Sequence, residues 1–324
     1  MKTVISTDRA AAVELLRKGD VVALPTETVY GLAANALNST AVAKIFEAKE
    51  RPRFDPLIVH LPSSEWLDRI GEVPACDRQL IGNLTERFWP GPFTIVVPKR
   101  DIIPDIVTAG LGNVAVRVSA HPVFAEIVRE LNEPIAAPSA NRFGRVSPTT
   151  AQHVLNELDE RISLIVDAGP TEHGIESTII AVQHGRIAVL RRGPITNEQL
   201  SEFAEVSSVV GATEISAPGQ LPWHYAPETP FSLIDNAKDF FPQKSQRVGL
   251  LTWKSSSGSP TNTERFAAVR NLSKSTDLRE AASNLFSHLR ELDALGLDLI
   301  VAERVPSQGL GAAIMDRLER AARK

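Results

Sequence analysis

Short runs of apolar and β-branched residues recur through the first two hundred positions, and each has the length of a buried strand. They are 21–24 (VVAL), 94–97 (TIVV), 114–118 (VAVRV), 163–166 (SLIV), 177–182 (STIIAV) and 186–190 (RIAVL). Helical patterns lie between many of them: AAAVELLRKG at 10–19, TAVAKIFEAKE at 40–50 and SPTTAQHVLNELDE at 147–160. Because the last two runs are joined at His184 and Gly185, we expect a hairpin there and a mixed sheet. The pattern predicts one α/β domain over residues 1–205.

A proline-rich segment separates this domain from a second α/β pattern. Residues 211–230 contain four prolines and no helical period, which is typical of an extended linker, and we place a linker or lid at 206–230. The runs PFSLI, RVGLL and LDLIVAE then predict strands, and two amphipathic patterns, 275–295 and 310–322, predict helices. The sequence therefore predicts a small Rossmann-like α/β domain over 231–324, in which the polar segment 254–264 is a loop.

Composition restricts the partners and the compartment of this chain of 324 residues. The 35 Lys and Arg against 39 Asp and Glu give a net charge of −4, so no global positive field exists and we expect no stable nucleic-acid binding. Cys76 is the single cysteine, which excludes an intrachain disulfide and favours the cytoplasm. No run approaches 18 uninterrupted apolar residues, so we expect neither a signal sequence nor a membrane span.

Polar groups follow several of the predicted strands, where ligand-binding groups gather in α/β domains. In PTETVYG at 25–31, Thr26, Glu27 and Thr28 supply hydroxyls and a carboxylate, although a turn with a helix cap would use the same residues. In VAVRV, Arg117 alternates with its valine neighbours and so faces the opposite side of the strand. Its charge needs a partner, and a protein carboxylate and a ligand carboxylate both stay open.

Cationic and hydroxyl side chains gather in further segments. In AKERPRFDP, the cations Lys49, Arg51 and Arg53 lie around the end of a helical pattern, where they either bind an anion or interact with the helix dipole. In the loop APSANRFGRVSPTT, Ser139, Asn141 and Ser147 are the types of residue that bind phosphates; an N-cap role for Ser147 is an equal alternative. Ser177, Arg191 and Arg192 stand at strand ends.

Familiar nucleotide and metal signatures are absent. No GxxxxGK[ST] occurs, and GLGAAI at 309–314 is better interpreted as a loop closing onto a helix than as a dinucleotide fingerprint. The seven histidines show no metal-binding spacing, so no protein metal site is predicted. The residues alone thus predict an anion-binding enzyme.

Seven blocks, taken in order, resemble the YrdC-like family of threonylcarbamoyl-AMP synthases. They are PTETVYGL, KIFEAKERP, DPLIVH, FWPGPFTIV, VAVRV, APSAN and GIESTII. The K-x-R…S-x-N signature of the family appears here as Lys49, Arg51, Ser139 and Asn141. The linker ending in HYAP and the tail from LRELDAL to IMDRL resemble the long form of the family. The resemblance implies a YrdC-like twisted mixed sheet followed by a small carboxy-terminal domain.

The resemblance also implies an activity and a set of site residues. Family members condense L-threonine, bicarbonate and ATP, with Mg2+ accompanying the ATP, and a tRNA threonylcarbamoyl transferase would receive the product. The implied ATP-binding residues are Lys49, Arg51, Asp55, Asn113, Ser139, Asn141, Ser147, Arg191, His224 and Tyr225. The implied threonine-binding residues are Thr28, His60, Arg117, Ala137 and Ser177. Lys49 and Arg51 are expected to be catalytic.

One departure and three alternatives accompany this resemblance. The linker reads PGQLPWHYAP where the long form commonly reads like PGMKYRHYAP, so Pro222 and Trp223 replace a tyrosine–arginine pair and would weaken closure of a lid. A double-stranded RNA or tRNA-binding module of the same fold is the alternative from another class. A dihydroxybutanone-phosphate synthase would need an acidic metal cluster, and a hydrogenase-maturation carbamoyltransferase would need cysteine-rich fingers; neither is apparent.

Overall fold

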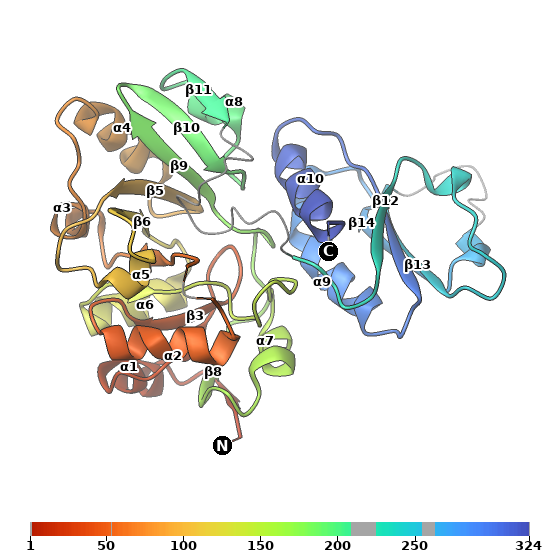
Figure 1. The fold of residues 1–324 in the computed structure, drawn as a ribbon, viewed down its shortest axis with the longest axis horizontal. Coiled ribbons are helices and arrows are strands. Elements are labelled where there is room, and N and C mark those ends of the chain that lie inside the picture. Colours follow the sequence, from red (N-terminus) through yellow and green to blue (C-terminus); the bar gives the residue numbers. More distant parts are fainter. Residues whose placement is uncertain (1, 53, 209–224, 255–262, 324) are drawn as a thin grey trace. The chain divides into compact units, whose positions relative to one another are not determined.

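The computed structural model describes residues 2–52, 54–208, 225–254 and 263–323. The chain forms two compact units (Figure 1). The first comprises residues 1–143, 148–172 and 176–221, and the second comprises 144–147, 173–175 and 222–324. Two short segments of the domain predicted at 1–205 therefore belong to the second unit. Most of the linker expected at 206–230 lies outside the described residues, although its first three residues form a strand of the first unit.

The first unit is built on a twisted mixed sheet whose described strands lie in the order β1-β8-β2-β3-β7-β4-β6-β5-β9-β10-β11 (Figure 1). Their bounds are β1 Val4–Ser6, β2 Val22–Leu24, β3 Gly31–Asn35, β4 Ile58–His60, β5 Phe93–Pro98, β6 Asn113–Arg117, β7 Ile135–Ala136, β8 Leu164–Val166, β9 Thr178–Gln183, β10 Arg186–Arg191 and β11 Val206–Ser208. β9 and β10 form the expected antiparallel hairpin, whereas β5 and β9 run parallel. The predicted mixed α/β sheet is confirmed.

Helices cover both faces of this sheet because strand residues alternate between the two faces. They are α1 Arg9–Arg17, α2 Ser39–Lys49, α3 Leu67–Ile70, α4 Arg78–Phe88, α5 Asp105–Thr108, α6 Pro122–Leu131, α7 Ala151–Leu158 and α8 Asn197–Ser201. A short 3-10 helix, Ser64–Trp66, precedes α3. Apolar residues of α1 and α6 pack with Val22 and Leu24 on one face, and those of α2, α4 and α7 pack with Ala23 on the other.

A smaller apolar cluster lies further along the face that α1 and α6 cover. Its buried members all come from strands: Ile58, Val96, Ala115, Ile179 and Leu190. The Ala137 amide bonds to the Ile58 carbonyl, and Ala137 belongs to the core beneath α1 and α6, which places both clusters on one side of the sheet. We call Ile58, Val96, Ala115, Ile179 and Leu190 the strand cluster.

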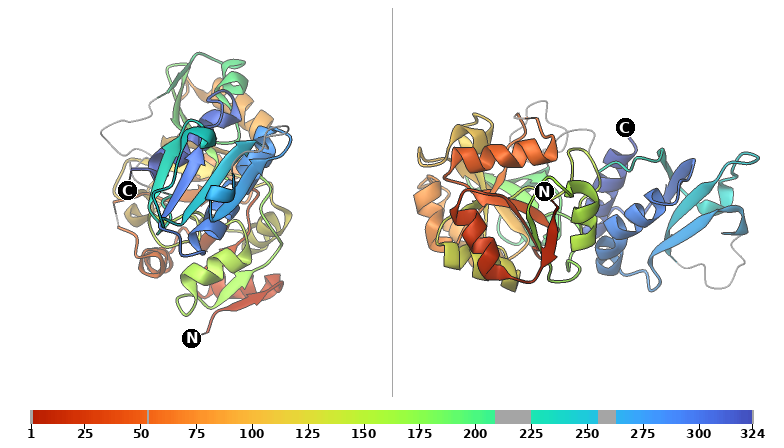
Figure 2. Two further views of the ribbon diagram at one scale, coloured as in Figure 1. Left: turned by 90° about the vertical axis from the view of Figure 1, so that its right-hand side faces the viewer. Right: turned by 90° about the horizontal axis from the view of Figure 1, so that it is seen from below.

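The second unit contains a parallel sheet in the order β12-β15-β13-β14. Its elements are β12 Phe231–Ile234, β13 Val248–Lys254, β14 Ala268–Ser273, β15 Leu299–Glu303, α9 Leu278–Asp293 and α10 Leu310–Ala321, with short 3-10 helices at Ala237–Asp239 and Thr263–Arg265. Both long helices lie on one side of the sheet (Figure 2). This parallel α/β unit confirms the predicted class, although β14 was not expected. Most of the polar segment 254–264 lies outside the described residues.

The glycines of GLGAAI have a packing role. Gly309 adopts a positive φ of 53° directly before α10, and a Cβ on Gly311 would lie 1.9 Å from the Pro306 carbonyl oxygen. Both positions therefore favour glycine where the loop closes onto the helix. The structure supports that interpretation rather than a dinucleotide fingerprint.

Candidate active site

Four polar side chains lie at one end of the central strands: His60, Thr94, Arg117 and Ser177. β4 and β6 run parallel, and His60 pairs in register with Arg117. β5 runs antiparallel to β6, so the start of β5, which carries Thr94, lies beside the end of β6. β9 runs parallel to β5, so Ser177, immediately before β9, lies at the same end. Register alone thus gathers residues that are up to 117 positions apart in sequence, the separation from His60 to Ser177.

The same four side chains also share one face of the sheet. Each stands two positions from a member of the strand cluster, and strand residues two apart point to the same side. All four are buried. A small apolar floor with polar groups at one end is the arrangement expected of a small-molecule site in an α/β domain.

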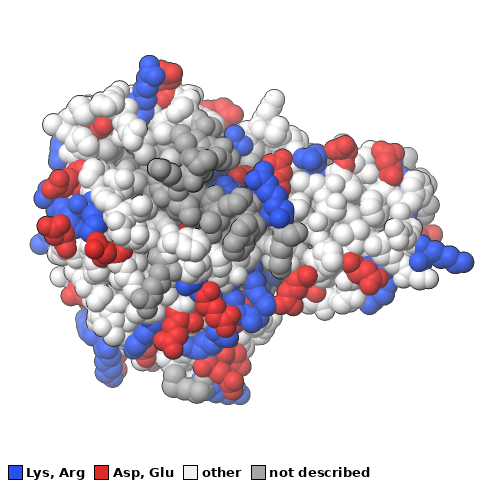
Figure 3. Space-filling view, viewed as in Figure 1, with Lys and Arg blue, Asp and Glu red and all other residues white. Residues whose placement is uncertain are grey.

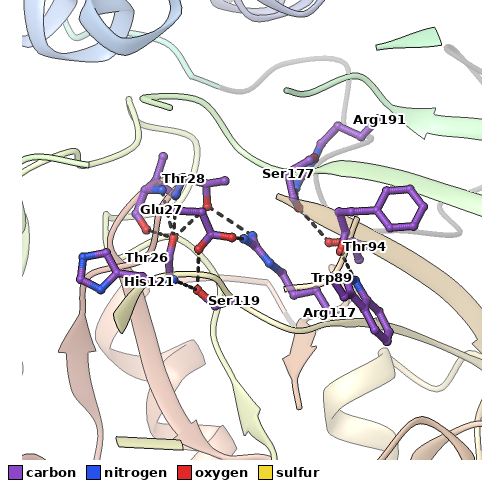
Figure 4. Close-up of polar contacts among 12 residues, drawn as sticks. Thr26, Glu27, Thr28, Trp89, Thr94, Arg117, Ser119, His121, Ser177 and Arg191 are labelled. Atoms are coloured by element: carbon purple, nitrogen blue, oxygen red, sulfur yellow. Dashed lines mark hydrogen bonds and ion pairs between the residues drawn. The ribbon is translucent and has the colours of Figure 1, made fainter. Parts of the chain in front are cut away.

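A β-bulge brings Arg191 to this group. The register between β9 and β10 shifts between Val189 and Arg191, so that Arg191 pairs with Ile179 of the strand cluster. A bulge inserts one residue and re-aims the side chains that follow it. Arg191 donates from Nε to the Ser177 carbonyl at 3.1 Å and from Nη2 to Ser177 Oγ at 3.0 Å (Figure 4). The cation therefore lies against Ser177.

The partner of Arg117 is the Glu27 carboxylate, with which it forms a buried ion pair (Figure 4). Arg117 also donates from Nη1 to Thr28 Oγ1 at 3.2 Å, and Ser119 donates to Glu27. Burial raises the pKa of Glu27, but the Arg117 charge and the Ser119 hydroxyl outweigh it and lower the pKa to about 2. Glu27 is therefore ionised at neutral pH and fixes the guanidinium plane.

A tight turn before β3 presents Glu27 and Thr28 to Arg117. Thr26 Oγ1 accepts from the amides of Thr28 at 3.1 Å and Val29 at 3.2 Å, and it donates to the Val29 carbonyl at 2.6 Å. Side-chain hydroxyls of this kind close local turns. Because β3 follows this turn, the helix-cap interpretation of PTETVYG is wrong and only its turn component holds.

His60 lies beside Arg117 as a neutral, buried imidazole. Burial first, and then the Arg117 charge, lower its pKa to about 3, against smaller opposing effects of Glu27 and the Ala137 backbone. Its ring centroid lies 4.7 Å from that of Phe124 in α6. Among the described residues, His60 Nδ1 and Arg117 Nε are buried without a hydrogen-bond partner. Two adjacent residues therefore each offer a polar atom to a bound ligand.

Lys49 is buried because it continues the apolar stripe of α2. Val42, Ile45 and Phe46 precede it at helical spacing, and all four side chains face the core. Its ammonium donates to the backbone carbonyls of Ser139, at 2.5 Å, and Asn141. Burial, with Arg51 nearby, lowers the pKa of Lys49 well below its ordinary value. Lys49 thus holds the S-x-N loop in place by bonding to the main-chain carbonyls of that loop.

Arg51 follows the point where α2 ends. Glu50 adopts the left-handed conformation, with φ at 52°, and turns the chain. The Arg51 guanidinium then pairs with Asp55 at 2.8 Å and donates to the Pro56 carbonyl at 2.9 Å. Both members of the ion pair are buried. Arg53, the third cation of this segment, lies outside the described residues.

The remaining predicted residues occupy several places. Asn113 is exposed at the start of β6, on the face of Arg117 but at the other end of the strand. Ala137 is buried beside β4, where its amide bonds to the Ile58 carbonyl. Ser147 and Tyr225 belong to the second unit, and His224 lies outside the described residues together with Pro222 and Trp223. The ligand roles of all these residues stay predictions.

The N-cap alternative for Ser147 is wrong. α7 begins at Ala151, and Thr150 caps it by accepting from the His153 amide at 3.2 Å. Ser147 is fully buried four residues before the helix. The capping hydroxyl is thus the one nearest the first helical turn, as capping geometry requires.

Sequence reasoning missed two hydroxyls of the site, Thr94 and Ser119. Thr94 Oγ1 lies 2.8 Å from Ser177 Oγ, and Ser119 donates to Glu27. In the run FTIV, Thr94 alternates with its neighbours. If the antiparallel pairing of β5 with β6 had been known, this alternation would have placed Thr94 on the same face as Arg117. No local pattern marks Ser119, because its partner lies 92 positions earlier.

Three wider properties concern metals, surface charge and membranes. Within the described ranges, no group of three or more His, Cys, Asp and Glu side chains could hold a metal ion. On the face drawn in Figure 3, Lys and Arg alternate with Asp and Glu and form no basic stripe. None of the helices in the described part of the chain is long and apolar enough to cross a membrane.

Known families match both parts of the chain. The family described as "Telomere recombination" matches residues 14–193, and the family described as "Threonylcarbamoyl-AMP synthase, C-terminal domain" matches residues 195–323. The first match includes Glu27, Arg117 and the S-x-N loop. The class defined by the fold and the site is thus that of YrdC-like proteins with a carboxy-terminal extension.

Full-length relatives narrow this class. The Threonylcarbamoyl-AMP synthase of Bacillus subtilis is 40% identical over 97% of this chain and 92% of its own, and that of Pyrococcus abyssi is 38% identical over 96% and 92%. The crystal structure of P. abyssi Sua5 complexed with L-threonine matches with a TM-score of 0.87 and 36% identity over 99% of this chain and 98% of its own. This chain belongs to the YrdC-like family of threonylcarbamoyl-AMP synthases, in its long form.

Proposed function

We propose that this protein is an L-threonylcarbamoyladenylate synthase, which condenses L-threonine, bicarbonate and ATP and releases pyrophosphate for the biosynthesis of threonylcarbamoyladenosine in tRNA. Full-length relatives of this name support the proposal, as does the complex of P. abyssi Sua5 with L-threonine. A cytoplasmic location belongs to the same proposal, because the single cysteine suits a reducing compartment.

The observation that carries the proposal is the set of hydrogen bonds that Arg117 makes, and the one that it leaves unmade, beside His60. Glu27 and Thr28 accept hydrogen bonds from the two terminal nitrogens of Arg117, so the guanidinium plane is fixed, and its buried Nε has no protein partner among the described residues. His60 adds a second donor or acceptor without adding charge. A guanidinium held in this way suits the carboxylate of an amino acid.

The reaction needs positioning more than it needs a strong base. The threonine nitrogen bonds to the bicarbonate carbon with loss of water, which gives a carbamate. A carbamate oxygen then bonds to the α-phosphorus of ATP, and the bond between this phosphorus and the oxygen of the departing pyrophosphate breaks. We propose that Arg191, which bonds to Ser177, neutralises negative charge between the two substrates.

On the nucleotide side, we propose two different roles for the K-x-R and S-x-N residues. Lys49 holds the loop carbonyls and thereby presents the side chains of Ser139 and Asn141 to the ATP phosphates. Arg51, oriented by Asp55, adds positive charge. Mg2+ would enter as part of the MgATP substrate, bound chiefly by the phosphates.

A pyrophosphate-release assay tests the proposal. The purified protein is expected to release pyrophosphate from ATP only when L-threonine and bicarbonate are both present, with Mg2+ in all reactions. Each component is omitted in turn as a control. Pyrophosphate release that does not depend on threonine would contradict the proposed function.

The alternative function, a double-stranded RNA or tRNA-binding module, is disfavoured by the full-length synthase relatives and by the net charge of −4. A gel shift with tRNA at physiological salt separates the two functions, because the synthase is expected to give no stable complex. We propose that the labile product passes to a tRNA threonylcarbamoyl transferase, which would catalyse the transfer to tRNA.

A further inference from the structure

Three buried side chains, on β5, on β10 and at the residue immediately before β9, form a hydrogen-bonded chain (Figure 4). Arg191 Nη2 donates to Ser177 Oγ at 3.0 Å, and Ser177 Oγ lies 2.8 Å from Thr94 Oγ1. Thr94 and Ser177 are fully buried. A buried hydroxyl is costly unless it is hydrogen-bonded, and valine would fill the place of Thr94 equally well. The Thr94 hydroxyl therefore has a role beyond filling space.

The number of hydroxyl protons in this chain exceeds the number of acceptors within it. Arg191 can only donate, so one lone pair of Ser177 Oγ accepts its proton. The two hydroxyls then hold two protons, and only one of these is used in the bond between them. The described residues provide no further acceptor for either hydroxyl. One hydroxyl proton in this chain is therefore available to a bound oxygen.

The position of the two hydroxyls decides which proton it is. All four polar residues lie at one end of the sheet, but Thr94 pairs with Ile179, two residues further into the sheet than Ser177, and its hydroxyl points toward Ser177. Ser177 precedes β9 and therefore lies nearer the end of the sheet. If Thr94 donates to Ser177, the oxygen of Ser177 accepts twice, and its own proton can point only to a third partner. The Arg191 charge alongside favours an anionic acceptor.

We infer that Thr94 is a positioning residue of the reaction. Its hydroxyl donates to Ser177 and thereby directs the Ser177 proton to an anionic oxygen of the threonine-derived substrate. This inference rests on the proposed function, because it takes from that function the identity of the ligand at Ser177. It assigns a role to Thr94, to which the sequence analysis gave none.

The test compares Thr94→Val, which keeps the shape and removes the hydroxyl, with Thr94→Ser, which keeps the hydroxyl. Thr178→Val is the matched control: Thr178 is also fully buried, but its hydroxyl donates to the Ile195 carbonyl at 2.7 Å, on the opposite face. Initial rates of pyrophosphate release are measured against threonine at saturating ATP and bicarbonate, and against ATP at saturating threonine. Thermal unfolding of each variant is measured in parallel.

We expect Thr94→Val to raise the KM for threonine about tenfold, the effect of misdirecting one hydrogen bond to a charged group. The KM for ATP is expected to stay within about twofold, and Thr94→Ser to restore wild-type values. Thr178→Val is expected to lower the unfolding temperature without moving either KM. A Thr94→Val variant with the wild-type KM for threonine, or a Thr94→Ser variant as impaired as Thr94→Val, overturns the inference. Wild-type protein that needs no threonine overturns the proposed function and the inference with it.

Discussion

Lys49 Nζ lies 2.5 Å from the carbonyl oxygen of Ser139, a residue 90 positions further along the chain. The ammonium also binds the Asn141 carbonyl, and the Phe143 amide returns a hydrogen bond to the carbonyl of Lys49. The K-x-R and S-x-N parts of the family signature thus form one physical unit. A buried cation satisfies loop carbonyls that would otherwise lack partners.

Substitution of Lys49 by Met is expected to release this loop. Each buried carbonyl that loses its partner costs about 1–3 kcal/mol, and loss of the lysine desolvation penalty offsets part of this cost. We expect pyrophosphate release to fall at least a hundredfold and the free energy of unfolding to decrease. Lys44→Met is the control, because Lys44 lies on the same helix but is partly exposed. Wild-type activity in Lys49→Met would exclude the role of Lys49 in the site.

Breaking the buried pair of Glu27 and Arg117 is expected to be costly. Arg117→Gln leaves the Glu27 carboxylate buried without its cation and should lower the free energy of unfolding by about 3–5 kcal/mol. Glu27→Gln should also destabilise the protein, and the double variant should lose less than the sum of the two, because the pair acts as a unit. The free energy of unfolding of all three variants is measured by urea denaturation.

An exposed ion pair provides the control for this cycle. Arg78 and Asp68 form a pair at 3.0 Å in which both side chains are more than half exposed. Arg78→Gln is expected to change the free energy of unfolding by no more than about 1 kcal/mol. Equal effects at Arg78 and Arg117 would show that the buried pair contributes nothing special to stability.

Acid is expected to destabilise the protein in two steps. The pKa of His60 falls from 6.5 to about 3 on folding, so between these values the unfolded chain binds a proton that the folded chain does not. The free energy of unfolding therefore decreases as the pH falls from 6.5 to 3. The pKa of Glu27 falls from 4.5 to about 2, which adds a second loss of the same sign below pH 4.5.

The interval between pH 6.5 and 4.5 isolates the effect of His60. His60→Asn is expected to reduce the slope of the unfolding free energy against pH by up to about 1.4 kcal/mol per pH unit there, the value for one proton. The pKa values of His121 and His288 are also lowered, chiefly by burial, but these residues are present in both proteins and their effects cancel in the difference. His184→Asn is the control, because the His184 side chain is exposed. Parallel curves for wild type and His60→Asn would contradict a buried neutral His60.

Arg290 of α9 is expected to influence the affinity for ATP. In the second unit, its guanidinium donates to the carbonyls of Val146 and, at 3.4 Å, Ser147, a predicted ATP-binding residue. Arg290→Gln should raise the KM for ATP several-fold through loss of these hydrogen bonds and leave the KM for threonine unchanged. Arg279→Gln is the control, since Arg279 is exposed on the same helix. Equal KM values for both variants and wild type would remove Arg290 from the site.

Local pattern was sufficient for six strands of the first unit, β2, β5, β6, β8, β9 and β10, and for the direction of several side chains, whereas β1, β3, β4, β7 and β11 were not predicted. Period-2 alternation placed Arg117 opposite its valine neighbours, and the helical stripe through Val42 and Phe46 continues to Lys49. The local pattern also predicts the hairpin at His184 and Gly185. By contrast, the two-residue strand β7 and the six-residue strand β14 are too short or too mixed in polarity to stand out from loops.

The sequence by itself determined the two α/β units, the faces of the strands and, through ordered family blocks, the class of enzyme. Only the tertiary structure decided which groups meet. The alternation of residues along the strand predicts which face of the sheet Arg117 occupies. It does not predict that Glu27, 90 positions earlier, is the partner of Arg117. The bulge that turns Arg191 onto Ser177 depends on the pairing of β10 with β9, and the pairing of Thr94 with Ser177 depends on the register of β5 and β9. Contacts between distant segments follow from strand order and register, which a local pattern does not encode.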